Sequence, residues 1–380
     1  MAGLTPNHSF PPSTSATRGA GMSVLGLTNI FCTGNALGNA PPKTMLPLIS
    51  LTTAAAVPAP APSPRRYSYA AVLGAVAVGL LAPGYANWLL GPALLAGMLL
   101  LGVAHGACDQ FVVPATHPAL AQGRGQYWAG FLGGYLGLAA AVGLLWWQKP
   151  GLTLVLFFGL TAGHWGSGDA PQQGVGRGQW LAHSLLRGSL LFAVPLWHWP
   201  TETQAIVNGL LALTGAAPVG LSLLGSTAAG LTLAIALGHG ALWLGYIRQG
   251  QRDLARTDAL EVLLLLALLL VLPPVLAAGV YFVFWHSLQH VLRMNALMDH
   301  HARSPRRSLS QELRFFLRRS APLLLVSLSG LALVFGLAWS HAANGTVLVS
   351  LALLAASIVT LPHALLVTLG MDAAQWRRSP

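Results

Sequence analysis

Charged residues are scarce in this chain. Asp, Glu, Lys and Arg make up 8% of the 380 residues, and Asp and Glu together number only 9. Soluble domains carry about a quarter charged residues, so this composition excludes a soluble surface over most of the chain. Cysteine is also rare, because Cys32 and Cys108 are the only two and lie far apart. That number argues against a disulfide framework and against a cysteine-rich zinc site.

Apolar residues take the place of the missing charges and make up 54% of the sequence. They form blocks of about 17 to 24 residues with few charges inside, which is the length that a helix needs to cross the hydrocarbon layer. Runs such as 262–272 lack the alternation of a membrane β-strand, and an open sheet edge is unstable in lipid. The sequence therefore predicts an all-α, polytopic transmembrane helical bundle.

The composition divides the chain into three parts. Residues 1–66 are a Pro/Ala/Ser-rich tail, which we expect to be disordered. Residues 67–372 are predicted to form one membrane-embedded helical domain, and residues 373–380 a short basic tail. Within the domain the apolar blocks predict about 10 spans (8–10), at residues 68–83, 87–108, 127–147, 151–168, 180–198, 225–247, 258–274, 276–297, 320–340 and 346–369.

The basic residues indicate how these spans are oriented. The net charge of +11 does not point to nucleic acid, because the basic residues lie in short loops, where they set membrane topology. If the amino terminus is cytoplasmic, the outside loops hold Lys149 alone. The inside segments then hold Arg65, Arg66, Arg124, Arg177, Arg248, Arg252, Arg256, the arginines of 303–319, Arg377 and Arg378. This pattern predicts that both termini are cytoplasmic, in a multi-pass protein of the cell (inner) membrane.

One inside loop has an amphipathic pattern. Apolar residues recur at helical spacing from Leu309 to Leu317, with arginines on the other faces, and Ser308 with Gln311 resembles a capping box. The pattern predicts an interfacial helix over 308–320 that rests on lipid headgroups; a solvated basic loop is the alternative.

The 13 histidines need an explanation, because an ionisable side chain within a membrane span is costly and usually functional. His286 and His290 are four residues apart on a predicted helix, so both rings project from one face about 6 Å apart, which suits two ligands of one metal ion. His105 and His164 end two spans on the same predicted side of the membrane. We therefore predict that these four histidines meet at one depth and bind a metal.

Other polar residues are weaker candidates. Asp109 and Asp169 follow His105 and His164 by four and five residues, and a carboxylate at such a place accepts the second ring N–H of a ligand histidine; an N-cap or a solvated surface position is the alternative. Candidates for an outer shell of the site, or for plain packing, are His183, His239 and His363. His300 and His301 lie in the basic loop and are expected to be solvated.

Neutral, all-nitrogen ligation suits Fe(II), Zn, Cu or Ni. Four imidazoles leave the charge of a divalent ion uncompensated and leave coordination positions open. This favours dioxygen chemistry on iron over a closed structural site.

At these residues the sequence resembles the Brp/Blh family, the bacterial and archaeal membrane β-carotene 15,15'-dioxygenases that form retinal for rhodopsins. The family's His-Gly-x-x-Asp element resembles residues 105–109, its His-Phe-Gly-x-x-Asp element resembles 164–169 with Trp165 for the Phe, and its Trp-His-Ser-x-x-His element matches 285–290. Residues 360–363, Thr-Leu-Pro-His, are also similar. The resemblance covers about residues 90–370, and the long amino-terminal tail departs from it.

The resemblance implies Fe(2+) held by His105, His164, His286 and His290. It also implies cleavage of the central double bond of β-carotene by O2 into two all-trans-retinal molecules, and a functional link to a retinal-binding rhodopsin. The bilayer would deliver the hydrocarbon, and apolar walls would come from residues such as Phe157, Phe158, Phe282, Phe284 and Trp285.

Two alternatives to this function stay open from the residues alone. A di-iron membrane hydroxylase or desaturase also uses clustered histidines, and a metal or proton transporter uses them as a permeation path. Small residues such as Gly133, Gly134 and Gly137 are expected to allow close helix packing in either case.

Overall fold

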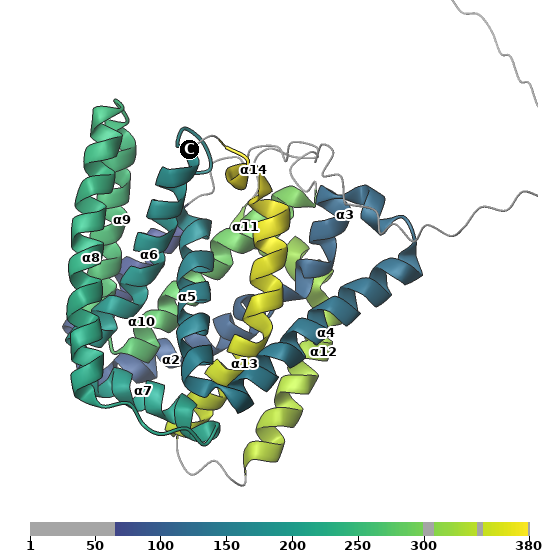
Figure 1. Cartoon of the computed structure of the whole chain (residues 1–380), viewed down its shortest axis with the longest axis horizontal. Helices are drawn as coiled ribbons and strands as arrows, with labels where there is room; N and C mark the ends of the chain where they lie inside the picture. The colour runs from purple at the N-terminus through teal and green to yellow at the C-terminus, as the bar shows by residue number, and fades with distance from the viewer. Residues whose placement is uncertain (1–64, 299–307, 340–344, 379–380) are drawn as a thin grey trace, which may run out of the picture. The chain divides into compact units, whose positions relative to one another are not determined.

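The computed structural model describes residues 65–298, 308–339 and 345–378, and these residues are helical with no strand among them. This confirms the all-α prediction (Figure 1). The helices are α1 (Arg66–Leu81), α2 (Ala86–Gly97), α3 (Val112–Thr116), α4 (Arg124–Gln148), α5 (Pro150–Asp169), α6 (Arg177–His198), α7 (Pro200–Leu213), α8 (Leu221–Arg248), α9 (Arg252–Val271), α10 (Pro274–Val280), α11 (Leu288–Leu297), α12 (Leu309–Trp339), α13 (Gly345–Leu366) and α14 (Ala373–Trp376). Residues 1–64 of the predicted tail, and His300 and His301, lie outside the described residues, so their disorder and solvation stay predictions. At Arg65 and Arg66 the predicted disorder is wrong, because α1 begins at Arg66 with Arg65 as its N-cap.

Six helical segments are long and apolar enough to cross a membrane: Pro83–Thr116, Arg124–Gln148, Leu221–Arg248, Pro274–Leu297, Leu309–Leu337 and Val347–Met371. The chain is therefore a multi-pass integral membrane protein. The count of about ten spans and the cytoplasmic placement of both termini stay predictions. Helices α5, α6 and α9 occupy predicted spans, but they carry polar and charged side chains, which lower their mean hydropathy.

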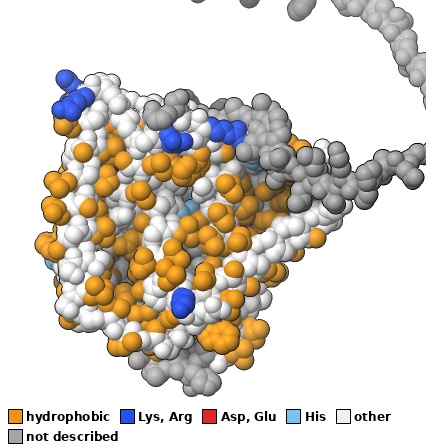
Figure 2. All heavy atoms as spheres, viewed as in Figure 1, with side chains coloured by type: hydrophobic (Ala, Val, Ile, Leu, Met, Phe, Trp, Pro, Cys, Tyr) orange, Lys and Arg blue, Asp and Glu red, His pale blue; other side chains and the backbone are white. Residues whose placement is uncertain are grey.

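The outer surface of the bundle is apolar. Leucines on α4, α8 and α12 such as Leu136, Leu237 and Leu333 are more than half exposed, and apolar side chains cover much of the face shown in Figure 2. A soluble protein rarely exposes so large an apolar surface, so these side chains are expected to contact lipid. On the same face, basic side chains gather mainly toward the end of the bundle that holds α14 (Figures 1 and 2).

The closest helix packing joins α5 to α6. A Cβ atom added at Gly166 would lie 1.7 Å from the carbonyl oxygen of Ser184, and one at Gly188 would lie 1.8 Å from that of Ala162. The two backbones are therefore in direct contact, as small residues permit in membrane bundles. The expectation that Gly133, Gly134 and Gly137 serve this purpose is wrong, because each faces open space with no atom within 4 Å of an added Cβ.

Helix α12 differs from the interfacial helix predicted for residues 308–320. The capping box is confirmed, since the Ser308 backbone N–H donates to Gln311 Oε1 at 3.0 Å and that of Gln311 to Ser308 Oγ at 3.4 Å. However, residues 309–320 continue without a break into the following span. Phe316 is fully buried, and Glu312 accepts a hydrogen bond from Asn295 at 2.7 Å. Phe316, Leu313 and Leu317 of the apolar stripe thus pack against α11 and residues 104–112.

Three stretches of π-helix interrupt the bundle: η2 (Met98–Gly102), η5 (Tyr281–Ser287) and η7 (Val367–Met371). The first lies between α2 and a short 3₁₀-helix, η3 (Gly106–Phe111), so the predicted span 87–108 is not one regular helix. Such wide turns are rare in proteins and often occur at functional sites. Each of the three lies within four residues of one of the candidate histidines or contains it.

Candidate metal centre

Five buried histidines meet in the middle of the bundle; we call them the histidine cluster. They come from the turn after η2, from α5, η5, α11 and α13, and neighbouring ring centroids lie 4.8 to 6.3 Å apart. Each is at most 7% exposed. The members are His105, His164, His286, His290 and His363.

The π-helical stretches set where these rings point. His286 lies within η5 and His290 one turn later, with ring centroids 6.3 Å apart and ring planes 21° from parallel, close to the spacing predicted from the sequence. His105 follows η2, and His363 lies four residues before η7. Because a π-turn adds one residue to a helical turn, it shifts the direction in which the next side chains project.

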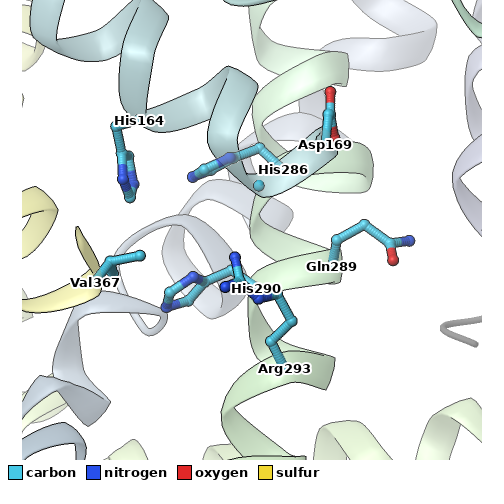
Figure 3. A pocket seen from close by; sticks show the side chains of 8 residues that line it. His164, Asp169, His286, Gln289, His290, Arg293 and Val367 are labelled. Carbon is cyan, nitrogen blue, oxygen red and sulfur yellow. The ribbon is translucent and has the colours of Figure 1, made fainter. Parts of the chain in front are cut away.

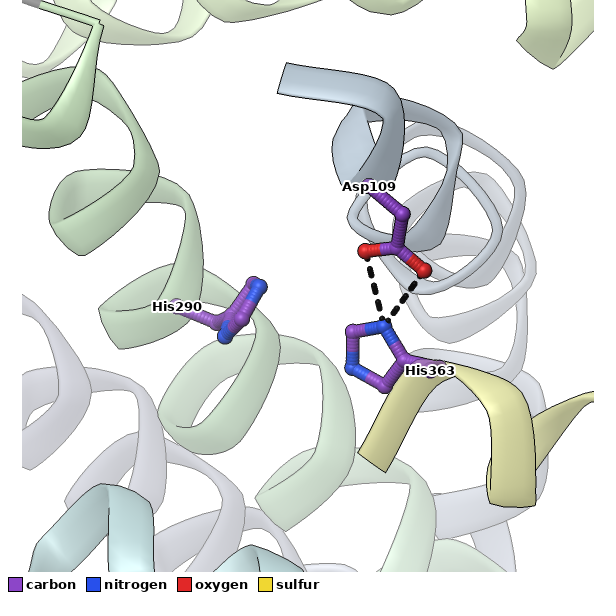
Figure 4. Close-up of side chains that lie close together, drawn as sticks. All are labelled: Asp109, His290 and His363. Carbon is purple, nitrogen blue, oxygen red and sulfur yellow. Dashed lines mark hydrogen bonds and ion pairs between the residues drawn. The ribbon is translucent and has the colours of Figure 1, made fainter. Parts of the chain in front are cut away.

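Asp109 joins the cluster through His363. The Nδ1 atom of His363 lies 2.9 Å from both carboxylate oxygens of Asp109 (Figure 4). One ligand atom each from Asp109, His290 and His363 all lie within 4.8 Å of one another. Among the described residues this group of side chains is close enough to hold a metal ion, and it includes only one of the four histidines predicted as ligands.

Several ring nitrogens of the cluster are buried without a hydrogen-bond partner. They are both nitrogens of His164 and the Nε2 atoms of His286, His290 and His363. Leaving a buried polar group unpaired is costly, so such a set needs a partner outside the protein chain. A metal ion that accepts neutral imidazole ligands fits this donor set.

A small cavity adjoins the cluster. It is lined by His164, Gly168, Asp169, His286, Gln289, His290, Arg293 and Val367, and Figure 3 shows the three histidines pointing toward one another from two helical segments. At its edge, Arg293 donates to Asp372 at 2.5 Å, and Ser167 donates to the same carboxylate at 3.2 Å. Asp372 thereby ties α11 to α5 beside the cavity.

Among the described residues, the Asp169 carboxylate forms no hydrogen bond to a histidine ring. It accepts hydrogen bonds from Tyr281 at 3.1 Å and from Trp285 at 2.8 Å, both on the π-helical stretch that carries His286. Asp169 therefore fixes the position of η5 against α5. The predicted pairing of Asp109 and Asp169 with His105 and His164 is not seen, because Asp109 pairs with His363 and Asp169 with η5.

Behind Asp169 lies a buried ion cluster that joins α1, α6 and α9. Its members are Arg65, Arg187, Asp258 and Glu261. Arg187 pairs with Asp258 and, at 3.0 Å, with Glu261. Arg65 pairs with Glu261 and also donates to the backbone oxygen of Asp169 at 3.0 Å. Each carboxylate is thus matched by a guanidinium, which is the condition for burying charge.

Of the other outer-shell candidates, His183 contacts this ion cluster and His239 does not. His183 lies 3.3 Å from Asp258 and 3.2 Å from the Tyr246 hydroxyl. The Nδ1 atom of His239 lies 3.0 Å from the Ile235 carbonyl oxygen, and its ring packs against Trp243. The structure thus brings together all four predicted ligands with His363 and Asp109, and it places His183 and His239 elsewhere.

Sequence reasoning missed Asp258, Glu261, Arg293 and Asp372 as supports of the site. Asp258 and Glu261 were detectable, because they are carboxylates at the start of an otherwise apolar predicted span, and such residues are usually functional. Nothing in the sequence near Asp372 indicates its contacts, since its partners lie 79 and 205 residues away.

Comparison with known proteins gives concordant matches. The profile of the family described as beta-carotene 15,15'-dioxygenase matches residues 96–371, a range that contains the whole histidine cluster. The probable beta-carotene 15,15'-dioxygenase Blh of Halobacterium salinarum is 31% identical over 302 residues, which covers 74% of this chain and 84% of that protein.

A second relative in the same organism, the probable beta-carotene 15,15'-dioxygenase Brp, is 29% identical over 219 residues, covering 54% of this chain and 58% of that protein. No solved structure matches the chain significantly.

Proposed function

Since the chain belongs to the β-carotene 15,15'-dioxygenase family, we propose that its histidine cluster holds Fe(II) and that the enzyme uses O2 to cleave β-carotene at the central double bond. The reaction balances without a further co-substrate, because each oxygen atom of O2 ends in one of two retinal aldehydes. The observation that carries the proposal is the set of buried, unpartnered ring nitrogens inside the matched region.

The residues that would hold the iron include the four predicted ligands, His105, His164, His286 and His290. His105 and His164 come from two separate segments and His286 and His290 from one continuous helical stretch, and the four rings are buried together. Neutral imidazole is a ligand that Fe(II) accepts. Iron bound there would supply the activation of O2. The protein's part is to hold the rings in place, which the α5–α6 contact and the bonds from Asp169 to η5 support.

Aromatic side chains next to the cluster offer an apolar path for the polyene. Phe282 packs against His105 and His286, with ring centroids 5.4 and 5.9 Å apart. Trp165 contacts Phe282 at 5.5 Å and Phe192 at 6.2 Å. These three rings are half-buried, so they are neither sealed in the core nor fully exposed. We place the substrate along them.

Entry from the bilayer follows from the nature of the substrate. β-Carotene is a hydrocarbon that partitions into lipid, and a histidine side chain is visible between the apolar side chains of the face shown in Figure 2. Lateral entry would spare the substrate any passage through water. The location in the cell (inner) membrane and the link to a retinal-binding rhodopsin remain part of this proposal. The hydroxylase and transporter alternatives are set aside because of the family assignment.

Expression in a carotene-accumulating bacterial host tests the function. The colour of the cells should fade while retinal accumulates, as measured by chromatography, and with ¹⁸O2 each retinal should carry one labelled oxygen. Products of unequal length would show that the cleavage is not central. Metal uptake by proteoliposomes without retinal would instead support a transporter and would contradict the proposal.

Alanine variants test the ligand set in the same host. The four predicted ligands are His105, His164, His286 and His290. Replacing any one of them should abolish retinal formation and lower the iron content, because each supplies a metal bond. His239→Ala is the matched control, since this histidine is equally buried but contacts Ile235 and Trp243. Loss of iron in the control but not in His286→Ala would show that the site is misplaced.

A further inference from the structure

His363 has two ring nitrogens in different situations. Nδ1 lies 2.9 Å from both oxygens of the Asp109 carboxylate, whereas Nε2 is buried without a partner. A carboxylate accepts hydrogen bonds, so the proton of the neutral ring resides on Nδ1. The lone pair of the ring is then on Nε2. This places a ligand atom, with its tautomer fixed, on the side of the ring away from Asp109.

The His363 ring lies among the other histidines. The ring centroid of His363 lies 4.8 Å from that of His105, 4.9 Å from that of His164 and 5.2 Å from that of His290. No other ring of the cluster contacts as many of the remaining histidines at 5.2 Å or less. His363 therefore occupies the middle of the cluster. The sequence alone does not indicate this, because no other histidine lies three or four residues from His363.

Asp109 is the only carboxylate that bonds to a ring of the cluster among the described residues. The nearest comparable contact is the one between His105 Nδ1 and the Ser287 hydroxyl, at 3.5 Å. Asp109 itself is fully buried and also accepts a hydrogen bond from Tyr135 at 3.3 Å. A buried carboxylate requires a positive partner, and a cation bound at His363 Nε2 would supply it through the ring.

From these contacts we infer that His363 is a further ligand of the metal and that Asp109 is the residue that orients it. The inference rests on the proposed function, because it assumes a metal in the cluster. A carboxylate that holds a ligand histidine fixes the ring orientation and raises its basicity, and loss of such a partner costs about 10–100-fold in metal affinity or activity. The site would then contain five imidazole ligands.

Metal binding to the purified full-length protein tests this without turnover. Co(II) is the probe, because its visible absorption reports coordination number and ligand type. The variants are His363→Ala and Asp109→Asn, with His239→Ala as control. We expect His363→Ala to raise the Kd for Co(II) by at least about 100-fold and to change the visible spectrum, because a bond is removed. Added imidazole should reverse both changes by filling the vacated position.

Asp109→Asn keeps the shape of the side chain and is the second arm. Its Kd should rise about 10–100-fold, with a spectrum near that of the unchanged protein, because the ligand atoms stay the same. If His363→Ala does not yield folded protein, this variant decides. An unchanged Kd in Asp109→Asn, or an unchanged Kd and spectrum in His363→Ala, would overturn the inference. If the unchanged protein itself binds neither Co(II) nor Fe(II), the proposed function fails first.

Discussion

Gly166→Ala is the substitution that should damage the site most for the smallest change in side chain. The added Cβ would lie 1.7 Å from the Ser184 carbonyl oxygen, and Cβ atoms essentially never approach within 3.0 Å. The two helices must therefore part by at least 3.0 − 1.7 = 1.3 Å at this point. The obstacle is backbone, so no side-chain rotation relieves it. His164 and Asp169 are two and three residues away on the same helix and would move with it.

The expected loss follows from this displacement. Overpacking of a core typically costs about 1–3 kcal/mol, and misplacement of reacting groups by about 1 Å can cost about 100-fold in rate. We expect retinal formation by Gly166→Ala to fall about 100-fold in iron-saturated membranes, with a lowered thermal midpoint of the purified protein.

Gly159→Ala is the matched control on the same helix. Gly159 is exposed, and an added Cβ would meet nothing within 4 Å. Ala is the better helix former by about 1 kcal/mol, so this variant should keep its activity within about twofold and should not lose stability. If Gly166→Ala matches Gly159→Ala in turnover and thermal midpoint, the close contact between α5 and α6 is not what positions the site.

Three further outcomes are expected. Asp258→Asn leaves the Arg187 guanidinium with one of its two carboxylates, so the purified protein should lose about 3 kcal/mol of unfolding free energy, measured by denaturant titration. The control is Asp253→Asn, in an exposed ion pair on the same helix, which should change the unfolding free energy by less than about 1 kcal/mol. Equal effects of the two variants would contradict the role of the ion cluster. Phe282→Ala should raise the KM for β-carotene several-fold with unchanged iron content, because it removes an apolar side chain beside the histidine rings. An unchanged KM would show that the substrate does not bind along Phe282. Reporter fusions at residue 310 and at the carboxyl end should both give a cytoplasmic signal, and a periplasmic signal at either would refute the topology.

The sequence predicted which histidines lie near one another where the information was local. His286 and His290 are one turn apart, so the helical period alone places their rings side by side. His105 and His164 end two apolar blocks with the same charge asymmetry, which predicted that they lie at one depth. The structure brings all four rings together, and their role as iron ligands stays a prediction.

The pairing of Asp109 required the tertiary structure. By position along the chain its nearest candidate partner is His105, four residues earlier, but the π-helical and 3₁₀ turns between Met98 and Phe111 rotate the carboxylate toward α13. The sequence predicts a regular helix for this span, because apolar periodicity does not reveal one extra or one missing residue per turn. The partner, His363, is 254 residues away.

For helix packing, too, the sequence determined one part and the tertiary structure the other. Block length and the lack of charge determined the membrane-spanning, all-α class, because the hydrocarbon layer admits few other solutions. Which glycines lie between helices was decided only by the fold, since Gly166 and Gly134 look alike in sequence but one touches a neighbouring backbone and the other faces open space. Hydropathy measures how a residue interacts with lipid. Hydropathy does not indicate which helix packs against which. The pairing of helices determines both the α5–α6 contact and the bond between Asp109 and His363.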